Sequence, residues 1–138
     1  MKILIILLFG LSTSIASAHE NKALAEQMKE MGDHFKVIID SLKKGTLTES
    51  DLIATESLQL NISNASLLYP EKANTDKKKV LYHDWMAKLG NNALHLESQI
   101  EVVLDSEAQD LAQVGIILKA MNKTRKLAHE EFKNDDGH

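Results

Sequence analysis

The chain has 138 residues, with one proline, no cysteine, 4% aromatic residues and a formal net charge of −4. Without cysteine, disulfides, thiolate-bound zinc, iron–sulfur clusters and haem attached through a C-x-x-C-H motif are excluded. The acidic balance offers no basic field for phosphates, so we expect no nucleic-acid partner.

Residues 1–18 have the features of a secretory signal peptide. Lys2 supplies the positive n-region, Ile3–Phe9 are apolar, and Ala16-Ser17-Ala18 is a small-residue cleavage site. The apolar run is too short for a comfortable transmembrane helix. Removal of the first 18 residues leaves 120 residues, which we expect to form one domain, residues 19–138, in the periplasm without stable membrane insertion.

The first two helices are predicted from apolar spacing and end signals. The first covers about Asn21 to Lys44 and precedes Gly45, a typical C-terminal residue. Its apolar stripe repeats at three and four residues, at Leu24, Met28, Met31, Phe35, Ile38 and Leu42. The second begins with a capping box from Thr48 to Asp51 and ends near Leu68, before Pro70. Its weaker apolar pattern consists of Leu52, Ile53, Leu58, Leu60 and Ile62.

A polar connection, residues 70–79, leads into a third helix over about Thr75 to Leu104. Its predicted buried stripe is Leu81, Trp85, Leu89, Leu96, Ile100 and Val103, and Gly90-Asn91-Asn92 is a weak spot that could bend it. A capping box from Ser106 to Gln109 predicts the start of the fourth helix, which runs to about Lys133. Its broad inward face is Val114, Ile117, Leu118, Met121, Arg125, Ala128, His129 and Phe132. Four such helices with mostly short turns favour an all-α, antiparallel up-down-up-down four-helix bundle.

The sequence contains none of the common catalytic motifs, so we expect a protein that is not an enzyme. An inward methionine or histidine, taken alone, is more often a core residue than a ligand. However, Met28 lies about two turns into the first helix and His129 about one turn from the end of the fourth. In an antiparallel bundle these positions share one end, so a thioether and an imidazole approach each other from opposite helices. That pair is an axial ligand set of electron-transfer cytochromes.

Two segments carry a resemblance to a known family. In the first helix, Met28 precedes the run Lys36-Val37-Ile38; in the fourth, Thr124-Arg125 precedes His129, which is followed by Phe132 and Lys133. Both segments resemble cytochrome b562, a family of periplasmic four-helix b-type cytochromes. The resemblance implies one non-covalent haem b per chain, with Met28 and His129 as iron ligands, and single-electron transfer as the function. It also matches Asp84-Trp85 to an acidic–aromatic pair beside the haem.

Met31 lies one turn from Met28 and is a competing ligand; the resemblance favours Met28, whereas spacing alone does not decide. Arg125, one turn before His129, is expected to reach the haem edge or a propionate. The side chains expected to line the porphyrin are Met31, Phe35, Trp85 and Met121.

Three other functions are compatible with the pattern. The first is a five-coordinate, haem-storing or gas-binding bundle, as in the related cytochromes c′. The second is copper handling by His19 together with His83 or His95, and the third is a haem-free structural bundle. For the electron carrier we expect a monomer or weak dimer that works with a redox partner protein whose identity the sequence does not specify.

Overall fold

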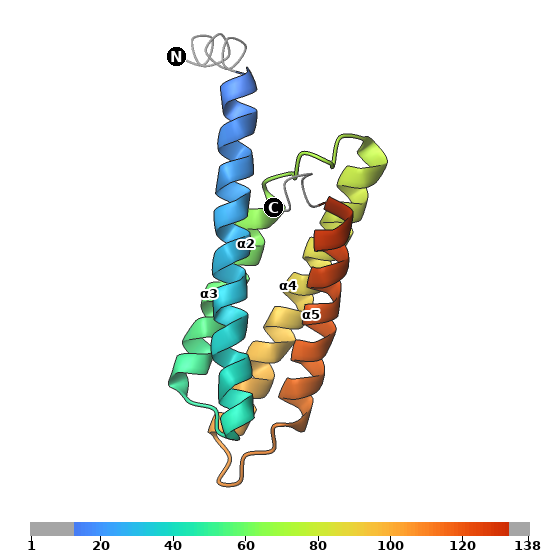
Figure 1. The fold of residues 1–138 in the computed structure, drawn as a ribbon. Coiled ribbons are helices and arrows are strands. Elements are labelled where there is room, and N and C mark those ends of the chain that lie inside the picture. Colours follow the sequence, from blue (N-terminus) through green and yellow to red (C-terminus); the bar gives the residue numbers. More distant parts are fainter. Residues whose placement is uncertain (1–12, 133–138) are drawn as a thin grey trace, which may run out of the picture.

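Four α-helices make up most of residues 13–132, the part of the chain that the computed structural model describes. They are α2 (Thr13–Lys44), α3 (Glu49–Ser66), α4 (Asp76–Leu104) and α5 (Ala112–Phe132). Consecutive helices run in opposite directions, so the N-terminal end of α2 and the C-terminal end of α5 lie at the same end of the bundle (Figure 1). The predicted antiparallel four-helix bundle is therefore confirmed.

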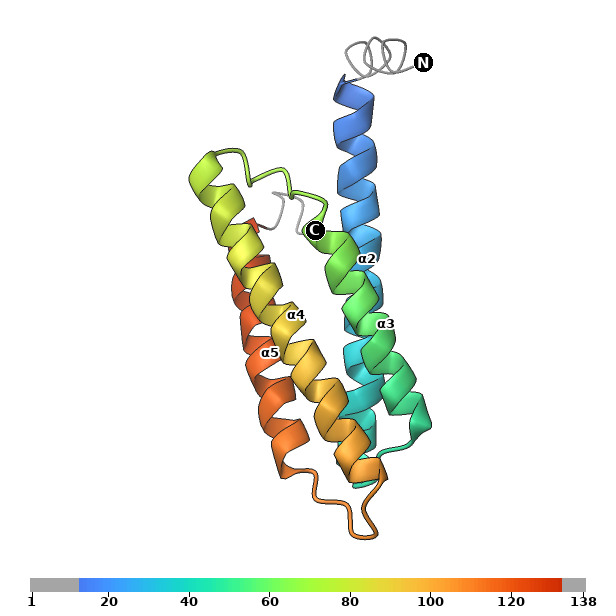
Figure 2. The ribbon, with the colours of Figure 1, turned by 180° about the vertical axis from the view of Figure 1, so that it is seen from behind.

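The four helices do not pack equally on one another. Contacts are extensive between α2 and α3, between α3 and α4, and between α4 and α5, whereas α2 and α5 touch over only a short stretch. Figure 2 shows the face on which α3 and α4 stand side by side. The bundle therefore has one loosely closed side, between its first and last helices. Within residues 13–132, none of the helices combines the length and apolar character needed to cross a bilayer.

Local capping signals account for three helix ends. After α2, Gly45 adopts a positive φ of 80°, and the N–H of Thr46 reaches back to the Ser41 carbonyl at 3.2 Å. This is a Schellman motif, for which glycine has the least steric cost. At the start of α3, the Asp51 Oδ2 atom accepts the N–H of Thr48 at 2.8 Å, as the predicted capping box requires. Thr75 caps α4 by accepting the N–H of Lys78 at 3.2 Å.

The predicted starts of the first and the fourth helix differ from the structure. Helix α2 begins N-terminal to the expected start near Asn21, because no proline or glycine interrupts residues 13–31. The apolar run Ile3–Phe9 and the tail from Lys133 lie outside the described residues. The weak spot at Gly90 does not interrupt α4, which stays helical through Asn92.

The predicted start of α5 at Ser106 is wrong. The Ser106 hydroxyl donates to the Val102 carbonyl at 2.8 Å and so completes the end of α4. Gln109 pairs with the backbone of Leu47: its Oε1 accepts the N–H at 2.9 Å, and its Nε2 donates to the carbonyl at 3.2 Å. Helix α5 starts only at Ala112, whose N–H is accepted by Asp110 Oδ1 at 3.0 Å. A long-range pair that satisfies both polar backbone groups of a buried residue thus overrides the local capping signal.

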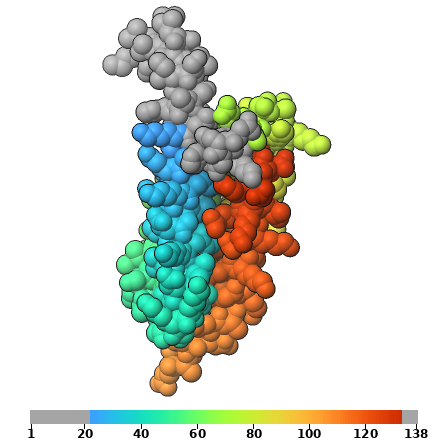
Figure 3. Space-filling model, viewed as in Figure 1, coloured from blue at the N-terminus to red at the C-terminus, as the bar shows by residue number. Residues whose placement is uncertain are grey.

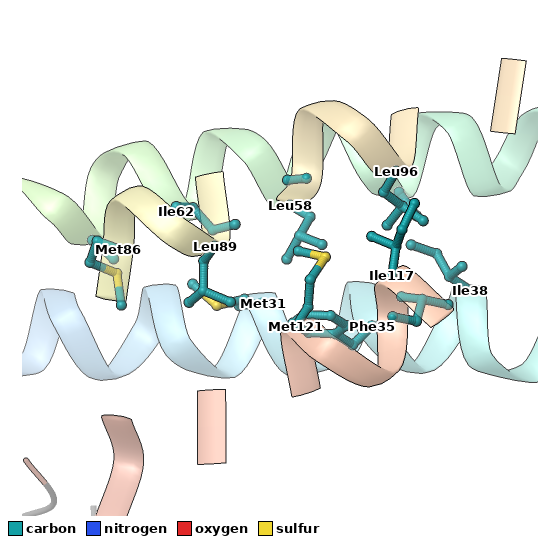
Figure 4. Close-up of a cluster of buried hydrophobic side chains, with 14 of the residues drawn as sticks. Met31, Phe35, Ile38, Leu58, Ile62, Met86, Leu89, Leu96, Ile117 and Met121 are labelled. Carbon is teal, nitrogen blue, oxygen red and sulfur yellow. The ribbon is translucent and has the colours of Figure 1, made fainter. Parts of the chain in front are cut away.

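Side chains from all four helices fill one apolar core. Figure 4 shows its centre, where methionine, phenylalanine, leucine and isoleucine side chains from different helices meet between the ribbons. The residues labelled there are all buried: Met31, Phe35, Ile38, Leu58, Ile62, Met86, Leu89, Leu96, Ile117 and Met121. The continuity of this core accounts for how a chain without disulfides closes into a bundle.

The buried faces of α3 and α4 differ in part from the predicted stripes. On α4, Tyr82 and Met86 are buried, whereas Leu81 and Trp85, at the neighbouring positions, are only half-buried. On α3, Ile53 and Leu60, two members of its weak apolar pattern, are exposed. An apolar helix with a weak periodic pattern offers more than one face, and its neighbours in the fold select which one is buried.

A buried amide ties α3 to α2 close to Met28. The side chain of Asn61 is 4% exposed, and its Nδ2 donates to Gln27 Oε1 at 2.9 Å and to Glu30 Oε2 at 2.8 Å. Its own Oδ1 is buried without a hydrogen-bond partner. One amide thus fixes the turn of α2 that contains Met28 relative to α3.

We expect Asn61→Ala to lower the free energy of unfolding by about 1–2 kcal/mol, because it removes two hydrogen bonds, one of them to a carboxylate. Equilibrium urea unfolding followed by circular dichroism measures the change. Ser63→Ala, on an exposed position of the same helix, is the matched control and should stay within about 0.5 kcal/mol of the wild type. An Asn61→Ala protein as stable as the wild type would show that the amide network contributes nothing.

Candidate functional site

The two residues expected to bind iron differ in exposure. Met28 is half-buried on α2 and packs against the core cluster. His129 is exposed in the last turn of α5, so the prediction that it belongs to the inward face of that helix is wrong. Met31, the competing methionine, is 0% exposed at the centre of the core. Met28 is therefore the methionine at the margin of the core, and Met31 is fully buried within it.

Arg125 crosses from α5 to α2. Its guanidinium carbon lies 5.4 Å from the centroid of the Phe35 ring, a cation–π contact. A Cβ atom built on Gly32 would lie 3.9 Å from Arg125 Nη1, so the guanidinium also passes along the backbone of α2. Its Nη2 donates to Asn122 Oδ1 at 3.0 Å, while its Nε is buried without a hydrogen-bond partner. A cation with an unsatisfied donor thus stands between the two helices.

The contacts of Arg125 fix the register of α5 against α2. In an antiparallel pair, each step toward the C-terminus of one helix corresponds to a step toward the N-terminus of the other. His129 lies four residues after Arg125, Met28 lies four before Gly32, and Met31 lies four before Phe35. Four residues rise about 6 Å along either helix. His129 therefore lies at about the level of the turn that contains Met28 and Met31.

This level falls on the side of the bundle where packing is weakest. Figure 3 shows α2 and α5 next to each other on the front face, and the stretch over which they touch is short. Asn61 holds α2 to α3 from the other side, through Gln27 and Glu30. Helices α2 and α5 thus pack mainly on α3 and α4, respectively, and make few contacts with each other.

The remaining predicted site residues divide into two groups. Met31, Phe35 and Met121 are at most 2% exposed and belong to the core next to Arg125. Trp85 is half-buried on α4, and its ring lies 5.6 Å from that of Phe132 at an angle of 78°. Phe132 lies three residues after His129 on α5. Trp85 thus reaches the end of α5 that carries His129, through a shared aromatic neighbour.

An aromatic cluster at this end of the bundle was not predicted from the sequence. Tyr82 is 1% exposed, donates from its hydroxyl to the Ala65 carbonyl at 2.6 Å, and lies edge-on to Phe132 with centroids 5.6 Å apart. Burial raises the pKa of this phenol well above its usual range. Tyr69 and His83 adjoin it. The spacing of Tyr82, Met86 and Leu89 at four and three residues was the available signal.

The structure also bears on the histidines named above as alternative candidates for copper binding. His83 and His95 both lie on α4, twelve residues or about 18 Å of helix apart. The side chain of His19 lies outside the described part of the chain. Among the residues described, no group of three or more histidine, aspartate or glutamate side chains is placed to hold a metal ion.

A surface hollow of about 490 Å³ lies on the other side of the molecule, between α3 and α4. Its walls are mixed, with Ile62, Met86 and Leu94 beside Gln59 and His83. None of the predicted haem-site residues lines it. The hollow is therefore separate from the candidate site between α2 and α5.

No protein-family model, curated protein or solved structure matches this chain.

Proposed function

We propose that this chain is a periplasmic electron-transfer protein that binds one non-covalent haem b between α2 and α5, after removal of residues 1–18. The observation that carries the proposal is the register fixed by Arg125, which brings His129 level with Met28 and Met31 across the most loosely packed pair of helices. A thioether and an imidazole on facing helices match the axial ligands of electron-transfer cytochromes.

The exposures of Met28 and His129 suit this role. The imidazole of His129 is exposed and the thioether of Met28 is half-buried, so neither side chain is locked inside the packed core. Bound haem would supply a single-electron couple at its iron. Met28 and His129 would both be used to hold the iron, so the chain itself would supply its ligands, as suits an electron carrier rather than an enzyme.

Arg125 and the core residues would complete the site. The buried, unpartnered Nε of Arg125 is suited to an anionic group such as a haem propionate, because a buried donor without a partner is costly. Phe35 holds the guanidinium through its ring face. Met31 and Met121, both fully buried, would exclude water and keep the local dielectric low.

Haem b added to the purified chain should bind one-to-one, give a low-spin six-coordinate spectrum and be removed completely by acidified organic solvent, since there is no cysteine for a thioether bond. Because haem binds the native state, we expect the thermal midpoint to rise; free haem at 100 times Kd stabilises by about 2.7 kcal/mol. Haem that stays on the polypeptide after extraction would contradict this binding mode. A high-spin ferric spectrum would support the five-coordinate alternative instead.

A haem-free structural bundle is the second candidate, and the closure of the core favours it. Met31, Phe35 and Met121 already fill the space between the helices without a cofactor. On this alternative, added haem would give no defined absorption bands, and the thermal midpoints with and without haem would coincide. The same titration therefore decides between the two functions.

A further inference from the structure

Tyr69 and His83 form a hydrogen-bonded pair at the surface, separate from the residues assigned to haem. Tyr69 lies in the connection after α3, and His83 lies in the second turn of α4. The Tyr69 hydroxyl is hydrogen-bonded to Nε2 of His83, and the rings meet edge-on, with centroids 5.2 Å apart. With the proton of the neutral imidazole on Nδ1, Nε2 is the acceptor of the phenolic proton. A phenol is thus joined directly to a base.

A lysine on the preceding turn of α4 also acts on Tyr69. The Lys79 ammonium lies 5.4 Å from the centroid of the Tyr69 ring. A nearby cation disfavours a positive charge on the ring. Loss of an electron from Tyr69 alone would create such a charge on the ring, whereas transfer of the proton to His83 at the same time leaves the ring neutral and moves the charge to the imidazole. The cation therefore acts against a charged Tyr69 ring, and the hydrogen bond to His83 gives the proton a place to go.

The other tyrosine of the chain lacks a base. Tyr82 is buried, and its hydroxyl donates to the backbone carbonyl of Ala65, which does not take up a proton at ordinary pH. The chain contains only two tyrosines. The difference between Tyr69 and Tyr82 therefore provides an internal comparison of a phenol with and without a proton acceptor.

A series of rings connects Tyr69 with the single tryptophan. Centroid distances are 5.8 Å from Tyr69 to Tyr82, 5.6 Å from Tyr82 to Phe132, and 5.6 Å from Phe132 to Trp85. Each step is an ordinary aromatic contact. An oxidising equivalent that arrives at Trp85 thus has a continuous aromatic path to the Tyr69 pair at the surface.

We propose that Tyr69 and His83 form a proton-coupled electron-donor site, from which a strong one-electron oxidant, a radical or a high-valent metal complex in solution, draws an electron. The phenolic O–H bond of Tyr69 breaks, the proton forms an N–H bond at His83 Nε2, and the electron passes to the oxidant. A neutral phenoxyl radical and an imidazolium remain, and a one-electron reductant restores the pair by the reverse step. The site does not depend on bound haem, so it stands whether or not the proposed function does.

Flash photolysis with photogenerated tris(bipyridine)ruthenium(III) tests the site on the mature chain as purified. Any haem that the chain binds is kept in the ferric state. We expect a phenoxyl radical signal by electron paramagnetic resonance, formed with a clear solvent isotope effect in heavy water. Tyr69→Phe should abolish the phenoxyl signal, whereas Tyr82→Phe should keep it. His83→Gln keeps a polar side chain but removes the base, and should slow radical formation by about 100-fold or more, as loss of a positioned proton acceptor typically does.

His95→Gln is the matched control, because it removes another exposed histidine of α4 and should leave the rate unchanged. Circular dichroism of each variant establishes that the helices are intact, and both residues of the pair lie outside the buried core. A radical that forms at the same rate in His83→Gln, or one that persists in Tyr69→Phe and disappears in Tyr82→Phe, would overturn the proposal.

Discussion

His129→Ala is expected to lower haem affinity by at least about 100-fold, because even loss of a partner in the outer shell of a metal site costs about 10–100-fold. His129 is exposed, so the same substitution should change the stability of the haem-free chain by no more than about 0.5 kcal/mol. Haem titration followed by absorbance measures the first quantity, and urea unfolding of the haem-free chain measures the second.

That separation between binding and stability makes the experiment decisive. A general disturbance of the fold would lower both quantities together. His95→Ala, also exposed, is the control for loss of a histidine and should leave both unchanged. If His129→Ala bound haem as tightly as the wild type, with the same six-coordinate spectrum, His129 would not be the ligand and the proposed site would be wrong.

Replacement of the two neighbouring methionines on α2 should have opposite effects on spectrum and stability. Met28→Ala should remove one iron ligand and convert the six-coordinate low-spin spectrum to a five-coordinate one. It should also lower the reduction potential and admit carbon monoxide. It should change the stability of the haem-free chain little, because Met28 is only half-buried. Met31→Ala should leave the low-spin spectrum in place but lower the free energy of unfolding by about 2–5 kcal/mol, since Met31 is 0% exposed.

Only one thioether can bind above the iron, and the two variants identify which one does so. Spectra, potentiometry and carbon monoxide binding are compared for both proteins, with the unfolding free energies beside them. If Met31→Ala opened the site and Met28→Ala did not, the ligand on α2 would lie one turn from the proposed position, while electron transfer would remain the proposed function. If neither variant changed the spectrum, methionine ligation would be excluded.

The candidate site was only partly predictable from the amino-acid sequence. Met28 and His129 stand out because the helix order places them at one end of the bundle, and the order follows from four periodic segments with short turns. Their difference in exposure does not follow from that pattern. Nor does the contact between Arg125 and Phe35, because it depends on the axial register of helices that are far apart in sequence.

The sequence by itself determined the helices and several of their ends. Thr48, Thr75 and Gly45 act within one turn of the chain, so their hydrogen bonds are specified by adjacent residues. The tertiary structure decided what depends on distant neighbours. Gln109 pairs with Leu47 and delays the start of α5, and Tyr82 rather than Leu81 faces the core because its hydroxyl reaches the carbonyl of Ala65 on α3. Leu81 and Tyr82 lie about 100° apart around the helix, and where apolar residues occur on both faces, the helices packed against them decide which face is buried.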